Sequence, residues 1–250
     1  MFSLLRSLLA TFLTLIFYFV FGLTLVIFHV FQLISYYTLG YQAHKKVVDW
    51  MNFFLSNEMR LLGTHIAVKG LENLPEDRSV IIVSNHQSMM DIPPIIWLLR
   101  KHHVKFIAKK ELSDWVPSIS FNLKKGGSLL IDRKKGSETI IQIGEYAEQL
   151  KANGFSICIF PEGTRSRNGQ LKPFKSGGLQ ALVDHSENLP IVPFVVHGNY
   201  KVFHKGSFPL QIGQKITYEI LPTIYRKDIE NKVAAEFVHQ QIATALDIGK

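Results

Sequence analysis

Residues 79–94 read SVIIVSNHQSMMDIPP, in which an apolar run typical of a buried strand leads into a polar loop and then into a helix. Pro93 and Pro94 suit the first turn of that helix, because the N–H groups that proline lacks have no partner there. Asp91 is therefore expected near the start of the helix, and His86 in the loop before it. On a continuous helix the two side chains would point about 140° apart, whereas a loop can fold His86 back onto Asp91.

An imidazole paired with a carboxylate has a defined chemistry. A carboxylate that accepts a hydrogen bond from one ring nitrogen of His86 holds the tautomer whose other nitrogen is free to take a proton. This is the acid and base arrangement that activates a hydroxyl group. The alternative is purely structural, with Asp91 capping the helix and His86 completing the loop. The spacing of the two residues alone leaves both interpretations open.

Outward from this stretch, short runs rich in Val, Ile and Phe alternate with helix-like segments, as in α/β folds. We predict a single α/β domain over residues 65–250, with a mixed sheet flanked by helices. The expected strands are 66–69, 80–83, 104–107, 129–131, 156–160, 191–196, 210–212 and 216–220, and the expected helices are 93–101, 137–151, 176–185 and 229–246.

A second polar turn follows a strand in residues 156–167, SICIFPEGTRSR. Gly163 permits a tight turn, and Glu162, Thr164 and Arg165 are expected at the carboxyl end of the strand, where α/β sheets usually bind ligands. The planar guanidinium of Arg165 suits a phosphate group. An ordinary turn held by salt bridges is the alternative.

Two further stretches are expected to contribute to the site. Residues 124–133, KKGGSLLIDR, place Arg133 at the end of another predicted strand. Residues 189–196 form an apolar strand interrupted by a proline, which we expect to line or support the site. Lysines between the first and third stretches, Lys109 among them, add positive charge.

The N-terminal region is apolar enough for a membrane. Residues 7–44 contain no Asp, Glu, Lys or Arg, and one bilayer crossing takes only about 20 residues. Residues 1–64 are therefore predicted to form a membrane anchor, either one spanning helix or a hairpin in one leaflet that turns near Gly22 or Gly40. The amphipathic pattern of residues 45–62 fits a helix on the body or on the bilayer surface. Basic residues after the apolar stretch place the body on the cytoplasmic side.

Composition limits the partners. The 250-residue chain carries a formal charge of +8, which favours a nucleic acid, an acidic membrane surface or a phosphorylated substrate. Mean hydropathy is positive, at +0.12. The single cysteine, Cys158, excludes an internal disulfide and a cysteine zinc site, and we expect its thiol to lie in the core.

Together, the four stretches resemble the glycerolipid acyltransferase family, in particular its 1-acylglycerol-3-phosphate acyltransferases, over about residues 66–196. The resemblance rests on NHQSMMD at 85–91, the block from Gly127 to Arg133, FPEGTRS at 160–166 and the strand at 191–196. It implies transfer of an acyl chain from acyl-CoA or acyl carrier protein to the sn-2 hydroxyl of lysophosphatidic acid, giving phosphatidic acid.

The resemblance also implies roles for the residues. His86 would take the proton of the hydroxyl and Asp91 would orient His86, without a metal or a bound cofactor. The expected partners are membrane lipid, the acceptor and the thioester donor, and not a nucleic acid. The acceptor phosphate and its pocket would involve Arg133, Arg165, Lys109, Glu162, Gly163 and Thr164.

Three other functions share these residues. A sibling enzyme would acylate glycerol 3-phosphate or another lysophospholipid. A hydrolase would use His86 and Asp91 on water and release free fatty acid. A lipid-binding protein without turnover would bind phosphatidic acid only, although the intact pair of His86 and Asp91 argues against it.

Overall fold

The computed structural model describes residues 2–76, 79–114, 116–132, 135–186, 188–229 and 233–248. Over these residues seven strands form one sheet in the order β1-β7-β6-β2-β5-β3-β4. All neighbouring strands are parallel except β6 and β7, which are antiparallel. The predicted mixed α/β sheet is therefore confirmed. The strands are β1 (His65–Lys69), β2 (Ile81–Ser84), β3 (Val104–Lys109), β4 (Leu129–Ile131), β5 (Ser156–Ile159), β6 (Ile191–His197) and β7 (Lys215–Ile220).

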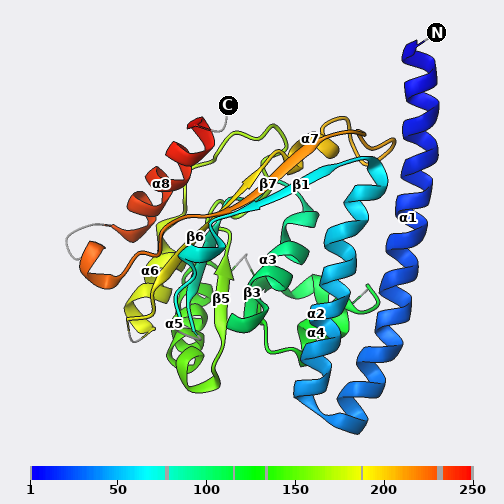
Figure 1. The fold of residues 1–250 in the computed structure, drawn as a ribbon. Helices are drawn as coiled ribbons and strands as arrows, with labels where there is room; N and C mark the ends of the chain where they lie inside the picture. Colours follow the sequence, from blue (N-terminus) through cyan, green and yellow to red (C-terminus); the bar gives the residue numbers. More distant parts are fainter. Residues whose placement is uncertain are drawn as a thin grey trace.

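Helices cover both faces of the sheet (Figure 1). Alternate residues of β2 point to opposite faces, as the period of a strand requires. Ile81 and Val83 pack with α5, α6 and α8 in one core, whereas Val80 and Ile82 pack with α3 and the N-terminal helices in the other. The helices are α1 (Phe2–Ile34), α2 (Tyr41–Glu58), α3 (Ile92–Leu98), α4 (Ile119–Lys125), α5 (Gly136–Asn153), α6 (Ser176–His185), α7 (Asn199–Val202) and α8 (Ala234–Ile248).

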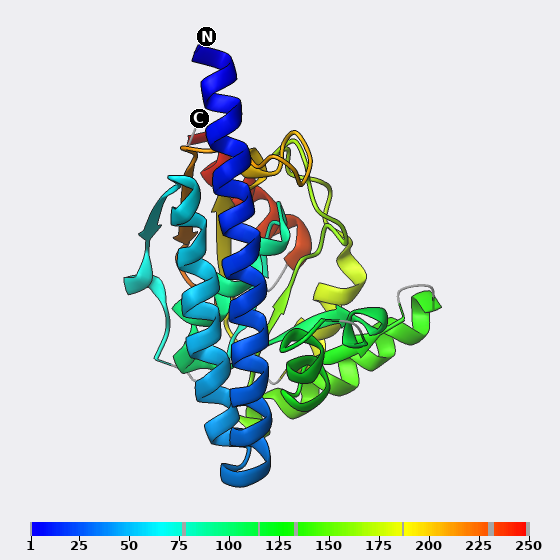
Figure 2. The ribbon, with the colours of Figure 1, turned by 90° about the vertical axis from the view of Figure 1, so that its right-hand side faces the viewer.

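The N-terminal region is a helical hairpin. Helix α1 ends in a π-helical turn over Ser35–Leu39, and Gly40, with φ of +81°, reverses the chain into α2. Of the two turn positions considered, the chain therefore turns at Gly40. Figure 2 shows α1 and α2 side by side, with the start of α1 projecting beyond the body. Residues 3–39 are long and apolar enough to cross a membrane, and most of their side chains are exposed.

The amphipathic helix α2 packs between α1 and the body. Its buried Met51 and Leu55 contact Leu25 of α1. On the side of α3, the rings of Trp50 and Phe53 lie 5.5 and 4.7 Å from the ring of Trp97. Of the two placements considered for residues 45–62, the structure has the one on the body.

Four elements differ from the sequence-based expectation. The segment 210–212 is not a strand, because its backbone is bound elsewhere: Leu210 N donates to Thr14 Oγ1 of α1, and Gln211 N donates to Val202 O. Helices α4 and α7 were not predicted. The helix expected from residue 229 begins at Ala234, after a short 3₁₀ turn at Arg226–Ile229 and residues 230–232, which lie outside the described part.

Candidate active site

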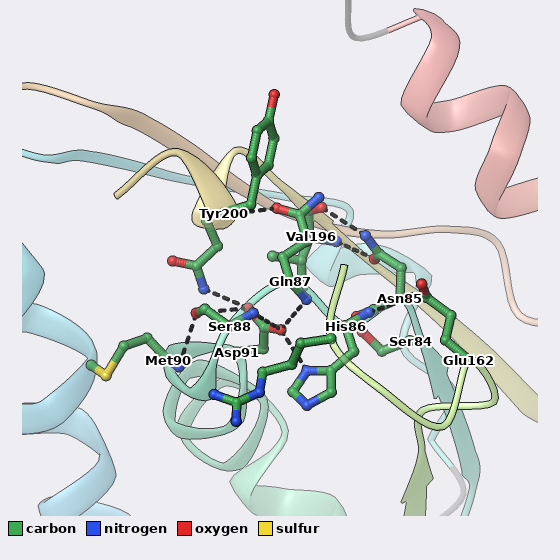
Figure 3. A network of polar contacts seen from close by, with 12 residues as sticks. Ser84, Asn85, His86, Gln87, Ser88, Met90, Asp91, Glu162, Val196 and Tyr200 are labelled. Atoms are coloured by element: carbon green, nitrogen blue, oxygen red, sulfur yellow. Dashed lines mark hydrogen bonds and ion pairs between the residues drawn. The ribbon is translucent and has the colours of Figure 1, made fainter. Parts of the chain in front are cut away.

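His86 and Asp91 touch at the carboxyl end of β2. His86 Nδ1 lies 2.8 Å from Asp91 Oδ2 (Figure 3). The Asp91 side chain is fully buried, whereas that of His86 is 17% exposed. Among the described residues His86 Nε2 has no hydrogen-bond partner. The loop therefore folds back as predicted and leaves one ring nitrogen accessible.

The loop itself holds the Asp91 carboxylate in place. Oδ2 accepts hydrogen bonds from the backbone N–H groups of Gln87 and Ser88, at 2.6 and 2.9 Å. The Ser88 hydroxyl caps the turn in return, accepting from Met90 N at 3.0 Å. This reciprocal capping box satisfies N–H groups that have no helical partner at the start of a helix. Asp91 is thus both the cap of the helix and the partner of His86, so the two interpretations of the sequence are compatible.

Phe160, at the end of β5, fixes the plane of the imidazole. Its ring stacks on His86 with centroids 4.1 Å apart and an angle of 20° between the planes. Phe160 holds one face of the imidazole and Asp91 holds Nδ1, so the ring of His86 has little freedom to rotate. The Cys158 thiol, two residues earlier in β5, lies in the core as predicted.

Glu162 binds backbone atoms of two loops. Its carboxylate is buried, and it accepts from His86 N through Oε1 at 2.7 Å and from Lys172 N through Oε2 at 3.1 Å. Burial raises the pKa of this carboxyl, and the two N–H groups oppose that shift. Glu162 therefore connects the loop after β2 to the loop after β5.

The rest of the second motif follows Glu162, and its Arg165 lines a groove together with Gln87 and Ser88. Gly163 has φ of +71° and lies against the Lys175 side chain, so a larger residue would be strained there. Thr164 and Arg165 are exposed. The groove has a volume of about 340 Å³, and its lining includes Gln87, Ser88, Met89, Arg165, Arg167, Tyr200 and, from α1, Tyr18.

Of the other two predicted binding residues, the structure describes only Lys109. Lys109 is exposed at the end of β3, which pairs in parallel with β5 and β4 and therefore ends at the same edge of the sheet as β2. Arg133 falls outside the described residues, just beyond the end of β4. Within the described residues no three His, Cys, Asp or Glu side chains form a group that could hold a metal ion.

Residues after β6 also reach the site, and the sequence analysis missed them. Asn199 Nδ2 donates to Asp91 Oδ1, and Tyr200 N donates to Gln87 Oε1 at 3.3 Å. The signal that could have found them is their position, since polar residues directly after a buried parallel strand lie at the ligand-binding edge of a sheet.

Comparisons with known proteins show similarity to acyltransferases. The chain is 35% identical over 144 residues to the 1-acyl-sn-glycerol-3-phosphate acyltransferase alpha of Ovis aries, covering 58% of this chain and 48% of that protein. It is 34% identical over 189 residues to the 1-acyl-sn-glycerol-3-phosphate acyltransferase of Cocos nucifera, covering 76% of this chain and 59% of that one. The matched part thus spans about half the length of these relatives.

A solved structure extends the likeness to nearly the whole chain. The crystal structure of a 1-acyl-sn-glycerophosphate acyltransferase from Thermotoga maritima superposes with a TM-score of 0.80 at 26% identity, over 97% of this chain and 96% of that one. The sequence model of the family described as Acyltransferase matches residues 65–197. That match includes β1 to β6 and both residues of the His86–Asp91 pair. Because it covers more than half of the sequence, the chain belongs to the acyltransferase family.

Proposed function

We propose that this protein transfers an acyl chain from acyl-CoA or acyl carrier protein to the sn-2 hydroxyl of lysophosphatidic acid, which yields phosphatidic acid. The observation that carries the proposal is the His86 ring, which Asp91 holds at 2.8 Å while the side chain stays partly exposed. The next two residues, Gln87 and Ser88, line a groove. The names of the relatives support the choice of acceptor, since they describe 1-acylglycerol-3-phosphate acyltransferases.

In this proposal His86 is the general base. Its Nε2 takes the proton of the sn-2 hydroxyl while the oxygen attacks the thioester carbonyl carbon. Asp91 stabilises the imidazolium that results, as the aspartate of a serine triad does, and the substrate hydroxyl stands in the place of the serine. The carbon–sulfur bond then breaks, and the leaving thiolate takes the proton back from Nε2. The cycle ends with a free thiol, an ester and His86 neutral again.

Arg165 is proposed to bind the acceptor phosphate, together with Arg133 and Lys109. Support comes from the position of Arg165 in the groove next to Gln87 and Ser88, the two residues that follow His86. A guanidinium gives paired, charge-assisted hydrogen bonds to a phosphate, which fix the orientation of the substrate. Glu162, Gly163 and Thr164 shape the turn that carries Arg165.

The N-terminal helix is proposed to hold the protein in the membrane where acceptor and product reside. Support comes from the apolar, exposed surface of α1 over residues 3–39. Tyr18 of α1 also lines the groove beside His86, so the anchor and the groove are in contact. If α1 spans the membrane, Lys45, Lys46 and Arg60 after it outweigh Arg6 before it, and this charge bias supports a cytoplasmic position for the catalytic body.

The decisive experiment is mass spectrometry of the lipids formed by purified protein from lysophosphatidic acid and a mixture of acyl-CoAs. Phosphatidic acid as the main product supports the proposal. Faster product formation from glycerol 3-phosphate or another lysophospholipid in competition would identify a sibling enzyme. Free fatty acid released without any acceptor would identify a hydrolase, and binding of phosphatidic acid without turnover would identify a lipid-binding protein.

A further inference from the structure

The inference concerns the second oxygen of the Asp91 carboxylate. Oδ2 binds His86 and two backbone N–H groups, whereas Oδ1 receives Asn199 Nδ2 at 2.5 Å and, at the longer distance of 3.4 Å, the Ser88 hydroxyl. The close donor to Oδ1 thus comes from a segment 108 residues further along the chain. Both side chains are fully buried.

The amide of Asn199 is oriented for this contact alone. Its Oδ1 is buried and accepts no hydrogen bond from the described residues. Leaving a buried acceptor unpaired carries a free-energy cost. If Asn199 contributed only packing, an apolar side chain of similar size would stabilise the fold more, because it has no polar atom to leave unpaired. The free-energy cost of the unpaired Oδ1 is therefore offset by a single hydrogen bond, from Asn199 Nδ2 to Asp91.

The backbone around Asn199 is fixed to the loop that carries the pair. Gly198, with φ of +80°, turns the chain from β6 into α7, and a Cβ there would collide with the carbonyl of Lys215. Asn85 exchanges two hydrogen bonds with the backbone of Val196, at 2.8 and 2.9 Å. With the bonds from Asn199 to Asp91 and from Tyr200 N to the Gln87 side chain, four hydrogen bonds join residues 196–200 to residues 85–91 (Figure 3).

We propose that Asn199 is a positioning residue of the acyl transfer, whose amide sets the orientation of Asp91 and thereby the tautomer of His86. The inference rests on the proposed function. Without the amide, Oδ1 loses its close donor while Oδ2 stays bound to Gln87 N and Ser88 N. The carboxylate can then tilt about Oδ2, which weakens its bond to His86 Nδ1 and lets the ring exchange the proton between its two nitrogens. Only the tautomer with the proton on Nδ1 leaves Nε2 able to act as a base.

The other groups around Asp91 do not compete for this role. The Cys158 thiol of β5 and the Tyr218 hydroxyl of β7 face the carboxylate, and burial raises the pKa of each. Both therefore keep their protons through neutral pH. Glu162 faces His86, with its oxygens bound to backbone N–H groups. Asn199 is thus the residue whose change should alter the Asp91 carboxylate itself.

The test uses two substitutions in the full-length protein. Asn199→Ala should lower kcat about 10-fold to 100-fold at every pH, because a hydrogen bond to a charged group is among the strong ones. The KM for lysophosphatidic acid should change less than twofold. Asn199→Asp puts two carboxyl groups within hydrogen-bond distance, and such pairs share a proton. While the proton remains, the acid donates to Asp91 as the amide does.

The Asn199→Asp variant should therefore be active at low pH and lose its activity at high pH. Its kcat should approach the wild-type value at the acidic end of the profile and then fall as the shared proton is lost, whereas the wild-type rate continues to rise to a plateau. Asn73→Asp is the matched control, because Asn73 Nδ2 donates to the carbonyl of Ile220 and to no ionisable group. Its profile should follow the wild type.

A spectroscopic measurement separates this inference from the proposed function. The ¹⁵N chemical shifts of His86, identified by their loss in His86→Ala, report which ring nitrogen carries the proton. Asn199→Ala should change them from one tautomer to a mixture, whether or not the protein acylates lysophosphatidic acid. A wild-type protein without acyl transfer would overturn the function alone. Wild-type rates and an unchanged His86 tautomer in Asn199→Ala would overturn the inference, as would an Asn199→Asp profile parallel to the wild type.

Discussion

The carboxylate of Glu162 accepts the backbone N–H of His86 at 2.7 Å, so the second motif holds the backbone of the first. The same carboxylate binds Lys172 N through its other oxygen. The two motifs lie 76 residues apart in sequence, and this buried group joins them at the edge of the sheet. In the proposed reaction the glutamate would act through the loop that carries His86.

The first prediction follows from this contact. Glu162→Gln turns one of the two acceptors into an NH₂ group that faces an N–H donor, so one bond is lost and one buried donor is left unpaired. The free energy of unfolding should fall by about 1–3 kcal/mol, and kcat should fall with it because His86 moves. Denaturant unfolding and steady-state kinetics measure both. The control is Glu138→Gln, at an exposed ion pair. Unchanged stability and kcat in Glu162→Gln would contradict the role.

His86 itself provides the second prediction. His86→Ala should remove nearly all turnover, since general-base catalysis is typically worth about 10²-fold to 10⁴-fold, while the fold and acceptor binding persist. Asp91→Asn should be similarly damaging, because the amide cannot stabilise an imidazolium. Product formation is measured by mass spectrometry, and circular dichroism confirms the fold. Rates like those of the wild type in a folded His86→Ala protein would refute the mechanism.

The third prediction concerns the acceptor phosphate. Arg165→Ala, like Arg133→Ala, should raise the KM for lysophosphatidic acid about 10-fold or more, since hydrogen bonds to charged groups contribute about 1.5–3 kcal/mol. The KM for acyl-CoA should change less. Arg60→Ala, which removes an exposed arginine after α2, is the control. If Arg165→Ala impairs saturation by acyl-CoA alone, the phosphate is bound elsewhere.

Sequence patterns predicted the features that depend on neighbours along the chain. The strand before His86, the prolines that open α3 and the folded-back loop all follow from the stretch at 79–94, and the structure has each of them. The Gly40 turn was one of two positions considered. These features are local, so residue spacing determines them.

Contacts between distant segments could not be predicted in this way. Glu162 was expected to shape a pocket, and the residue patterns gave no sign that its oxygens bind two backbone N–H groups, one of them 76 residues away. Leu210 was expected in a strand, yet its N–H binds the Thr14 hydroxyl of α1. Asn199 follows a strand that was expected only to line or support the site. In each case a tertiary partner, absent from the local pattern, decides the conformation.

Lys105 gives a prediction on stability. Its ammonium group is buried between Tyr41, whose hydroxyl accepts from it at 2.6 Å, and the ring of Phe155. The described residues place no carboxylate within ion-pair distance of it. Burial, with repulsion from Lys45, lowers the pKa of Lys105 to about 7. The unfolded chain therefore binds more protons than the folded one between about pH 7 and the ordinary lysine pKa near 10.4.

Stability should accordingly rise with pH across this window, because the cost of burying the charge is complete below pH 7 and disappears as the folded lysine loses its proton. Lys105→Met removes the titrating group and should flatten the rise. Urea unfolding at pH 7, 8 and 9 measures the slope. The matched control is Lys135→Met, at an exposed ion pair, which should keep the wild-type slope. Parallel curves for wild type and Lys105→Met would show that Lys105 is charged in the folded protein.

The last prediction concerns the outer face of α1. Leu8, Phe12 and Phe19 are 60%, 60% and 72% exposed, so their replacement by glutamine should leave the fold intact. Each apolar side chain transferred from water to lipid contributes about 1.5–3 kcal/mol, and the triple variant should therefore leave the membrane far more readily than the wild type. Sedimentation with vesicles measures binding: the wild type should need detergent for release, and the variant should come off in salt. Ile141→Gln, at an equally exposed position on α5, is the control. A wild type released by salt alone would show that charge, and not the apolar face of α1, holds the protein on the membrane.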